Sequence, residues 1–206
     1  MLLAIDTSSG TSVAVVDRDA GVLSEVAEAD TMRHAEVIGV LIGDALDRAD
    51  VPVSALSGVV AGMGPGPFTG LRVGIAAAKA FAIGAGRPLV PVVSHDAIAA
   101  EHYASGAEGA LLVVTDARRR ERYWTAYSGV DEWGLPVRLD GPGLARPDEL
   151  PHAAIARLDA TAVSAGRLGM IAEIRFANRR PADPDEPLYL RSPDVTLSAG
   201  PKRVSA

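Results

Sequence analysis

The chain has 206 residues, of which 48% are hydrophobic, 22% charged and 4% aromatic, and its formal net charge is −6 at pH 7. This balance is typical of a globular protein with a core of small aliphatic side chains, and it excludes a disordered chain. The absence of cysteine excludes a disulfide framework and a thiolate metal site. An acidic chain also lacks the basic surface that neutralises phosphates, so we do not expect it to bind nucleic acid tightly by itself.

Two local features bear on location and charge. The N-terminal sequence MLLAIDTSSG has an apolar run too short for a signal peptide or a membrane span, so we expect a soluble cytoplasmic protein that does not enter a membrane. The one basic cluster comprises four arginines interrupted by Glu121, within 118–122. We interpret this cluster as a solvated turn.

The first half of the chain alternates between strand and helix patterns. In chain order, apolar runs and periodicity predict strands over 2–5, 12–16 and 22–27, a helix over 32–50, a strand over 56–62, a helix over 69–84, a strand over 89–93, and a helix over 94–104 capped by Ser94. The first three strands are interpreted as two antiparallel hairpins. Val51-Pro52 ends the first helix, because a residue before proline leaves the helical region.

A second pattern of an apolar strand, an aspartate, a polar turn and another strand begins at residue 110. At an offset of 110 residues Asp6 coincides with Asp116, and each ends an apolar strand and precedes a hairpin. This echo predicts two related lobes, 1–105 and 106–206, with ligands at the carboxyl ends of the strands. Beyond it we expect loop material with short strands at best over 134–151, a strand over 160–164, a helix over 167–177, and a loose tail over 192–206.

The turn DTSSGT at 6–11 has the composition of a phosphate-binding hairpin. Hydroxyl groups and backbone N–H groups could receive anionic oxygens there, while Asp6 holds a metal or polarises water. The alternative is an Asx or Ser/Thr turn that satisfies its own backbone, which is common in hairpins. From the residues alone we favour the alternative.

The stretch GMGPGPFTGLRVG at 62–74 is the most specific feature of the sequence. It is neither a Walker A loop, since no Lys-Ser/Thr follows the glycines, nor a GxGxxG motif. Its prolines restrict φ while its glycines allow unusual conformations, so it predicts a rigid turn before a helix capped by Thr69. Arg72 falls in the first helical turn, where the macrodipole disfavours a cation, so it should meet a partner carboxylate or a phosphate. The structural turn comprises Gly64, Pro65, Gly66, Thr69, Gly70 and Arg72.

The helix over 32–50 carries two glycines on one face. Gly39 and Gly43 each cost roughly 1 kcal/mol relative to alanine in a helix interior. Glycines four residues apart allow a second helix to approach closely. Two interpretations stay open: a helix buried on two sides within its own domain, or a helix that packs on its own sheet with one face and on another subunit with the other.

The chain's histidines do not form a recognisable site. His34 would need a second histidine at Ile38 to form a helical metal pair. His95-Asp96 stands at a helix start, which favours capping over catalysis. With no GxSxG motif either, we predict no catalytic set and no metal site.

Four blocks are similar to the TsaB family, the non-catalytic dimerisation subunit of the bacterial machinery that makes threonylcarbamoyladenosine in tRNA. The blocks are LLAIDTSSGTSVAV, RHAEVIGVLIGDAL, GPGPFTGLRVGIAAAKAFA and DARRRERYWTAY, with a shorter echo, PLYLRSPD, at 187–194. The resemblance implies a two-lobed α/β fold of the actin, sugar-kinase and Hsp70 type with mixed sheets flanked by helices. It also implies a TsaD-like catalytic subunit and a TsaE-like ATPase as partners, tRNA contact only through the complex, and a metal centre that belongs to TsaD.

In this family the helices of the first lobe mediate self-association or pairing with TsaD. The resemblance therefore assigns the partner interface to His34, Glu36, Val37, Gly39, Val40, Leu41 and Gly43. A homodimer of the isolated chain stays open as an alternative.

Two departures from the family pattern bear on nucleotide binding. Pro67 replaces a common serine and removes a backbone donor, and Arg120 replaces a glycine and crowds the approach to Asp116. The resemblance then implies a degenerate nucleotide or phosphate turn at Asp6, Thr7, Ser8 and Asp116. We expect no cofactor, with weak ATP or ADP binding at the complex left open, and a scaffold function. The rivals are an ATP-dependent small-molecule kinase of the same fold and, less in keeping with the missing metal pair, a metalloprotease.

Overall fold

A computed structural model describes residues 1–191, so the loose tail predicted over 192–206 lies outside the described residues. The first of its two sheets has the strand order β3-β2-β1-β4-β5. Its strands are β1 (Leu2–Asp6), β2 (Thr11–Asp17), β3 (Gly21–Glu28), β4 (Gly58–Gly62) and β5 (Leu89–Val92). β2 pairs antiparallel with both β1 and β3, which confirms the two N-terminal hairpins. β1 also pairs parallel with β4, so the sheet is mixed.

The second sheet has the order β8-β7-β6-β9. Its strands are β6 (Leu111–Asp116), β7 (Arg122–Val130), β8 (Pro136–Ala145) and β9 (Ala156–Asp159). The prediction of loop material with short strands at best over 134–151 was wrong for β8, whose glycines and two prolines are tolerated because it lies at the sheet edge. The strand expected over 160–164 was also misplaced, since the residues that pair with β6 are those of β9.

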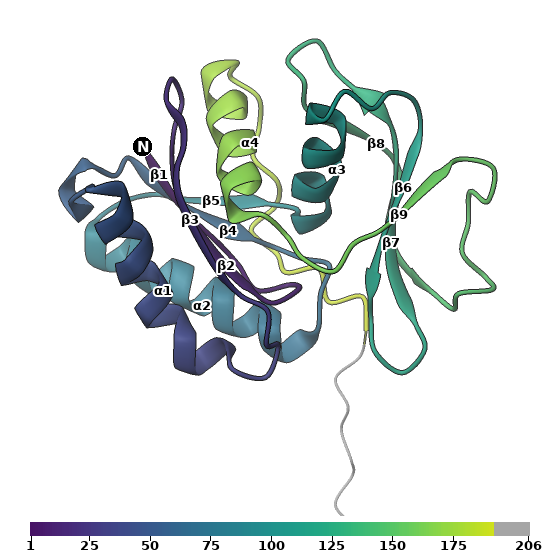
Figure 1. Cartoon of the computed structure of the whole chain (residues 1–206), viewed down its shortest axis with the longest axis horizontal. Coiled ribbons are helices and arrows are strands. Elements are labelled where there is room, and N and C mark those ends of the chain that lie inside the picture. Colours follow the sequence, from purple (N-terminus) through teal and green to yellow (C-terminus); the bar gives the residue numbers. More distant parts are fainter. Residues whose placement is uncertain (192–206) are drawn as a thin grey trace, which may run out of the picture.

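The helices form two layers. The helices α1 (His34–Ala49) and α2 (Phe68–Ala85) cover one face of the first sheet, and a short 3-10 helix (Val53–Ala55) follows α1. The helices α3 (Ser94–Ala104) and α4 (Ala165–Ala177) lie between the two sheets (Figure 1). Although α4 belongs to the second half of the chain, it packs on strands of the first sheet. The division into domains 1–105 and 106–206 therefore stays a prediction.

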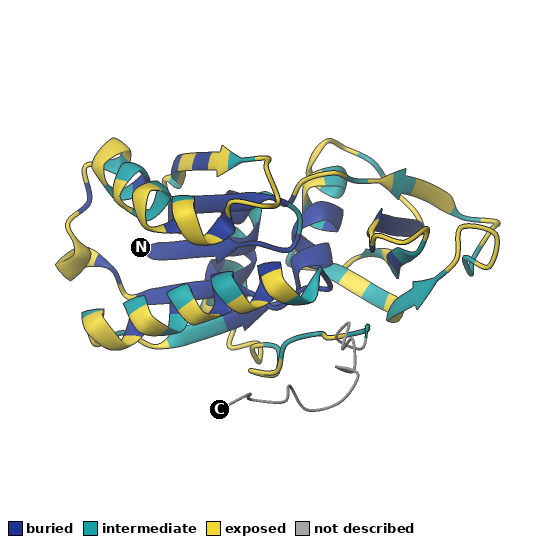
Figure 2. Ribbon diagram, turned by 90° about the horizontal axis from the view of Figure 1, so that it is seen from below, coloured by how far each residue is buried: buried dark blue, intermediate teal, exposed yellow. Residues whose placement is uncertain are grey.

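The two larger hydrophobic cores among the described residues follow from this layering. One lies between the first sheet and the α1–α2 layer, and includes Leu3, Ile5 and Leu71. The other contains residues of both sheets together with α3 and α4, so Ala4 and Leu111 belong to the same cluster. The buried strands run through the centre of the molecule, with the exposed helix faces outside them (Figure 2). The two sheets are therefore joined by a common core.

Two predicted helix caps were wrong. α2 begins at Phe68 after Pro67, so Thr69 is its second residue and caps nothing. α3 follows Val93, and Ser94 is its first residue. The Ser94 hydroxyl instead donates to the Asp6 carboxylate at 2.5 Å and accepts from the Gly64 N–H at 3.0 Å. These partners lie far away in the sequence, so the local pattern could not indicate them.

One helix of the described chain, α2, is long and apolar enough to cross a membrane by length and composition alone. In this fold it packs against β4 and β1, which accounts for its apolar side chains.

Two glycines of α2 predict opposite effects on stability. A Cβ at Gly74 would overlap the Thr7 side chain, whereas a Cβ at Gly84 has no neighbour within 4 Å. We expect Gly74→Ala to lower the free energy of unfolding by about 1–3 kcal/mol through overpacking. Gly84→Ala should raise it by roughly 0.5–1 kcal/mol through helix propensity. Urea unfolding of both variants checks this, and equal effects would contradict the packing described.

A buried histidine predicts acid sensitivity. The ring of His95 lies 2.8 Å from the Thr125 hydroxyl and 2.9 Å from the Thr115 hydroxyl. Burial, with a smaller effect of Arg138, lowers its pKa from 6.5 to about 3. As the pH falls, His95 therefore takes up a proton at a higher pH in the unfolded chain than in the folded one. The free energy of unfolding should decrease between pH 6.5 and about 3. Urea unfolding should show a shallower loss over this range for His95→Gln than for the unmodified chain; an equal loss would exclude this origin.

Candidate functional site

A cleft of about 480 Å³ lies near the carboxyl end of β1, where the starts of α1 and α2 meet the turn between β6 and β7. Its walls include His34, Phe68, Gly70, Arg118, Tyr123 and Arg191. Both lobes therefore contribute to it. Four of these residues belong to the three segments that the sequence analysis singled out: His34 to the helix with two glycines, Phe68 and Gly70 to the glycine–proline stretch, and Arg118 to the arginine-rich turn.

The groups of the DTSSGT turn point inward instead of into open solvent. Asp6 is buried, and its carboxylate accepts from the Ser8 N–H at 2.8 Å and the Ser8 hydroxyl at 2.6 Å. The Thr7 hydroxyl donates to the Gly70 carbonyl at 2.7 Å. Burial raises the pKa of Asp6, and the hydrogen bonds from Ser8 and Ser94 oppose that rise. This geometry is an Asx turn, the arrangement favoured from the residues alone.

The corresponding turn in the second lobe is open and strained. Asp116 is exposed and forms an ion pair with Arg122. The three arginines that follow it, Arg118, Arg119 and Arg120, have φ values of 61°, 49° and 65°. Left-handed backbone costs roughly 1–2 kcal/mol for each residue other than glycine. The turn brings the Arg118 guanidinium within 3.1 Å of the Thr31 hydroxyl, so Arg118 spans from one lobe to the other.

The glycine–proline turn fits closely against its neighbours. Gly64 has a φ of 88°, and a Cβ at Gly66 would come within 2.8 Å of the Ser8 backbone. A Cβ at Gly70 would come within 2.7 Å of the Thr7 carbonyl oxygen. Arg72 is exposed, and its guanidinium lies 4.4 Å from the centre of the Phe68 ring. No carboxylate among residues 1–191 pairs with Arg72. The choice between a carboxylate and a phosphate as its partner stays a prediction.

His34 stands alone at the start of α1. It is buried, and its Nδ1 lies 2.8 Å from the Thr11 hydroxyl. Burial lowers its pKa, which Asp6 partly opposes. The side chain one turn later is Ile38, and the described residues contain no group of three His, Cys, Asp or Glu side chains able to hold a metal ion.

The outward face of α1 is open. The buried residues of α1 are His34, Ile38 and Ala45. On the opposite face, the exposed residues include Glu36, Gly39, Val40 and Gly43, while Val37 and Leu41 are half-buried. Val40 is 63% exposed, and a Cβ at either glycine would meet no atom within 4 Å. Within residues 1–191 the helix is therefore buried on one side, not on two.

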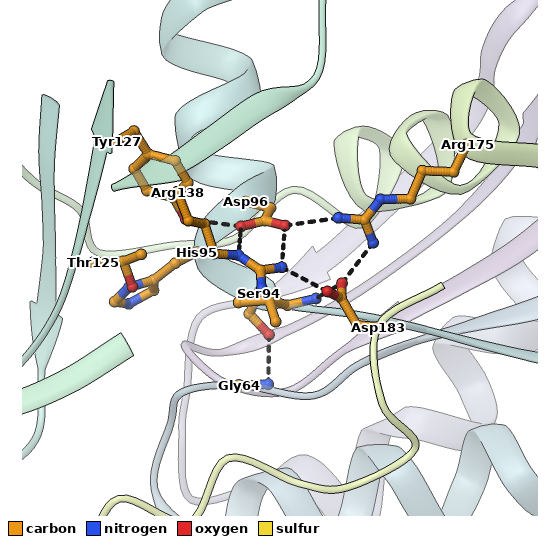
Figure 3. Close-up of polar contacts among 10 residues, drawn as sticks. Gly64, Ser94, His95, Asp96, Thr125, Tyr127, Arg138, Arg175 and Asp183 are labelled. Atoms are coloured by element: carbon orange, nitrogen blue, oxygen red, sulfur yellow. Dashed lines mark hydrogen bonds and ion pairs between the residues drawn. The ribbon is translucent and has the colours of Figure 1, made fainter. Parts of the chain in front are cut away.

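Sequence reasoning missed an ion cluster around Asp96, which joins α3, β8, α4 and the C-terminal segment (Figure 3). Asp96 is 1% exposed, and its carboxylate accepts from Arg138 at 2.7 and 2.5 Å and from Arg175 at 3.1 Å. The Tyr127 hydroxyl donates to the same carboxylate at 2.9 Å. The capping interpretation of His95-Asp96 was therefore wrong. Because the partners come from β8 and α4, no local spacing could indicate them.

Asp183 completes this cluster from the C-terminal segment. It accepts from Arg138 at 2.8 Å, from Arg175 at 2.5 Å and from the Val93 N–H at 3.1 Å. Burial raises the pKa of Asp183, but the two guanidinium groups outweigh that effect and the net shift is downward.

From Asp183 the C-terminal segment continues toward the cleft. The Leu188 N–H donates to the Met63 carbonyl at 2.9 Å, and the Tyr189 ring lies 4.7 Å from the Phe68 ring. Arg191 donates to the Ala117 carbonyl at 3.2 Å. Residues 183–191 thus connect the ion cluster to the wall of the cleft.

The fold and cleft define a two-lobed α/β protein of the actin, sugar-kinase and Hsp70 type. A crystal structure of a Pseudomonas aeruginosa protein with similarity to peptidase YeaZ has a TM-score of 0.79 and 25% identity, covering 92% of this chain and 99% of that one. The family model for TsaD, tRNA N6-adenosine threonylcarbamoyltransferase, matches residues 7–134.

Two relatives complete the comparison. An uncharacterised Mycobacterium tuberculosis protein is 40% identical, covering 94% of this chain and 93% of its own. The Escherichia coli tRNA threonylcarbamoyladenosine biosynthesis protein TsaB is 28% identical, covering 80% of this chain and 70% of its own. The chain therefore belongs to the TsaB family.

The ion cluster predicts a large difference between two neighbouring aspartates. Asp183→Asn leaves the guanidinium groups short of one counter-charge, so we expect a loss of about 3–5 kcal/mol in the free energy of unfolding at pH 7. The matched control is Asp185→Asn, which breaks the exposed pair with Lys79 and should cost at most about 1 kcal/mol. Because the folded-state pKa of Asp183 lies below its ordinary value of 3.8, the difference should narrow as the pH falls below 3.8. Similar losses for both variants in urea unfolding would contradict this account.

Proposed function

We propose that this chain takes part in forming threonylcarbamoyladenosine in tRNA, as a non-catalytic scaffold subunit in the cytoplasm. It pairs with a TsaD-type catalytic subunit, and a TsaE-type ATPase acts on the pair. The observation that carries this proposal is the outward face of α1, where two exposed glycines flank an exposed valine.

The chemistry of this face suits a helical partner. Gly39 and Gly43 cost helix stability, and a Cβ at either position would have no neighbour within 4 Å in the part of the chain that the structure describes. Their lack of side chains leaves a shallow surface beside Val40 on which a second helix can approach closely. Glu36 and Arg33 form an exposed ion pair at the start of the same helix, which supplies a polar edge. An apolar centre with a polar edge is the common plan of a protein–protein interface.

The scaffold interpretation rests on how the polar groups of the two strand-end turns and of the start of α1 are engaged. Thr7 and Ser8 direct their hydroxyl groups to internal acceptors, and Asp116 is paired with Arg122. His34 has Ile38, not a second histidine, one turn away. The net charge of −6 supports contact with tRNA through the complex and not through this chain alone.

A second candidate function, an ATP-dependent kinase acting on a small molecule, draws support from the cleft itself. Arg118 and Arg191 line it together with the start of α2, and a helix N-terminus favours anions. Calorimetric titration with ATP and Mg²⁺ separates the two: stoichiometric binding with phosphate transfer would favour the kinase. Weak binding seen only with a TsaD-type partner would fit the scaffold.

Reconstitution tests the proposed activity directly. The chain alone should form no threonylcarbamoyladenosine on tRNA when supplied with a threonylcarbamoyl donor. The TsaD-type and TsaE-type proteins of the same organism should do so only when this chain is added. Modification of tRNA by the chain alone, or undiminished modification without it, would overturn the scaffold function.

Gly43→Leu tests the interface. The new side chain projects into open space in the isolated chain, so folding should be unchanged, while close approach of a partner helix is blocked. We expect recovery of the TsaD-type protein in a pull-down to fall at least tenfold. The matched control is Glu101→Leu, which places leucine on the exposed surface of α3 and should leave recovery unchanged.

Size-exclusion chromatography of the same two variants addresses self-association. If the isolated chain forms a homodimer through α1, Gly43→Leu should convert it to a monomer. Full recovery of the TsaD-type partner by a folded Gly43→Leu variant would exclude this face as the interface.

A further inference from the structure

The charges in the wall of the cleft between the lobes are positive. Among the described residues that line it two are arginines, Arg118 and Arg191, and none is an aspartate or a glutamate. Arg191 lies 3.6 Å from the Glu121 carboxylate, so its charge is partly balanced. The Arg118 guanidinium donates to the Thr31 hydroxyl at 3.1 Å, and no carboxylate among residues 1–191 forms an ion pair with it. The cleft therefore favours an anion.

The first turn of α2 forms one wall of this cleft and has no cap. Pro67, the residue before the helix, has no side chain that accepts a hydrogen bond. The N–H groups of Phe68, Thr69 and Gly70 donate to no described residue, and all three residues line the cleft. The unpartnered N–H groups and the positive end of the macrodipole attract an anion to this end of an 18-residue helix. Many helices begin in this way, so the neighbouring side chains decide whether a ligand binds.

The side chain of His34 supplies an independent donor at the same place. It is 7% exposed, it lines the cleft, and its Nδ1 lies 2.8 Å from the Thr11 hydroxyl. Its Nε2 forms no hydrogen bond with residues 1–191, and a Cβ at Gly70 would come within 3.0 Å of it. The Nε2 edge of the ring therefore faces the first turn of α2. When the Thr11 hydroxyl donates to Nδ1, the proton of the neutral ring is on Nε2, so the ring offers an N–H group to the cleft.

We propose that this cleft binds a phosphate group, held by the first turn of α2, the Nε2 of His34 and the guanidinium of Arg118. These donors come from three separate elements: the starts of α1 and α2, and the turn between β6 and β7. A tetrahedral oxyanion has acceptor oxygens that point in several directions, whereas the two oxygens of a carboxylate lie in one plane. Donors that approach from three elements therefore suit a phosphate better. This binding goes beyond the proposed scaffold function and involves no transfer of the phosphate.

The rest of the cleft suits a phosphate that is carried on a compact organic group. Its apolar and aromatic walls include Met32, Phe68, Val73 and Tyr123. A volume of about 480 Å³ lies within the usual range for ligand pockets and leaves room for such a group beside the phosphate. Because no carboxylate lines the described part of the cleft to hold Mg²⁺, binding should not require that ion. This separates the site from that of a kinase, which would bind ATP together with Mg²⁺.

Titration of the full chain with phenyl phosphate in the absence of Mg²⁺, followed by two-dimensional NMR, tests this site. The unmodified chain should show saturable shifts of the Thr69 and Gly70 N–H groups, whereas phenol, which lacks the phosphate, should bind about tenfold more weakly or not at all. Titration with inorganic phosphate separates two sources of the anion. Weaker binding than that of phenyl phosphate indicates an organic ester, and equal binding indicates free phosphate.

Two arginines of one turn provide a matched pair of variants. Arg118→Gln removes an exposed charge, so folding should be intact, and phenyl phosphate should bind about tenfold more weakly. Arg120→Gln changes a residue of the same left-handed turn that does not line the cleft, and should bind as the unmodified chain does. His34→Leu removes the ring donor and should weaken binding to a similar extent. If the loss of the contact with Thr11 prevents folding of that variant, the arginine pair still decides.

Three results would each overturn the proposal: shifts that do not saturate, shifts that map away from the first turn of α2, or equal affinity of the unmodified chain and the Arg118→Gln variant. None of them bears on the scaffold function, which reconstitution and Gly43→Leu test separately.

Discussion

The constraint on which much of this structure depends is the burial of the Asp96 carboxylate. Removing an ion from water costs several kcal/mol even after relaxation, so such a group is retained only with well-placed partners. Here the partners are the guanidinium groups of Arg138 and Arg175, which are shared with Asp183 (Figure 3). Satisfying them requires α3, β8, α4 and the C-terminal segment to meet at one point. A displacement of any of these elements would leave a charge uncompensated.

This requirement explains why the two sheets share a core. α3 and α4 lie between the sheets, and the apolar cluster around them includes residues of both (Figure 1). The C-terminal segment leaves the ion cluster at Asp183 and reaches the cleft wall at Arg191. A lobe arrangement held in this way suits a subunit whose proposed task is to present a fixed surface to a partner, since preorganisation lowers the entropic cost of binding.

The exposed face of α1 carries glycines that no contact among the described residues explains. Several of the chain's glycines are explained by close internal contacts: Gly66 admits the Ser8 backbone, and Gly74 admits the Thr7 side chain. Gly39 and Gly43 have no such neighbour among residues 1–191. Glycines that weaken a helix without serving the packing of its own fold indicate a constraint from outside, which is why this face carries the proposed function.

The sequence by itself determined the local elements and the family. The alternating apolar runs placed β1, β2, β4, β5 and β6, and helical periodicity placed α1 to α4 within a few residues, because these patterns depend only on neighbours along the chain. Its main errors had one physical cause. β8 and β9 are strands because they pair with β7 and β6, and Ser94 and Asp96 have their roles because distant groups reach them. Only the tertiary structure could decide these points, together with which face of α1 is exposed, since burial and long-range pairing arise when segments far apart in the chain meet.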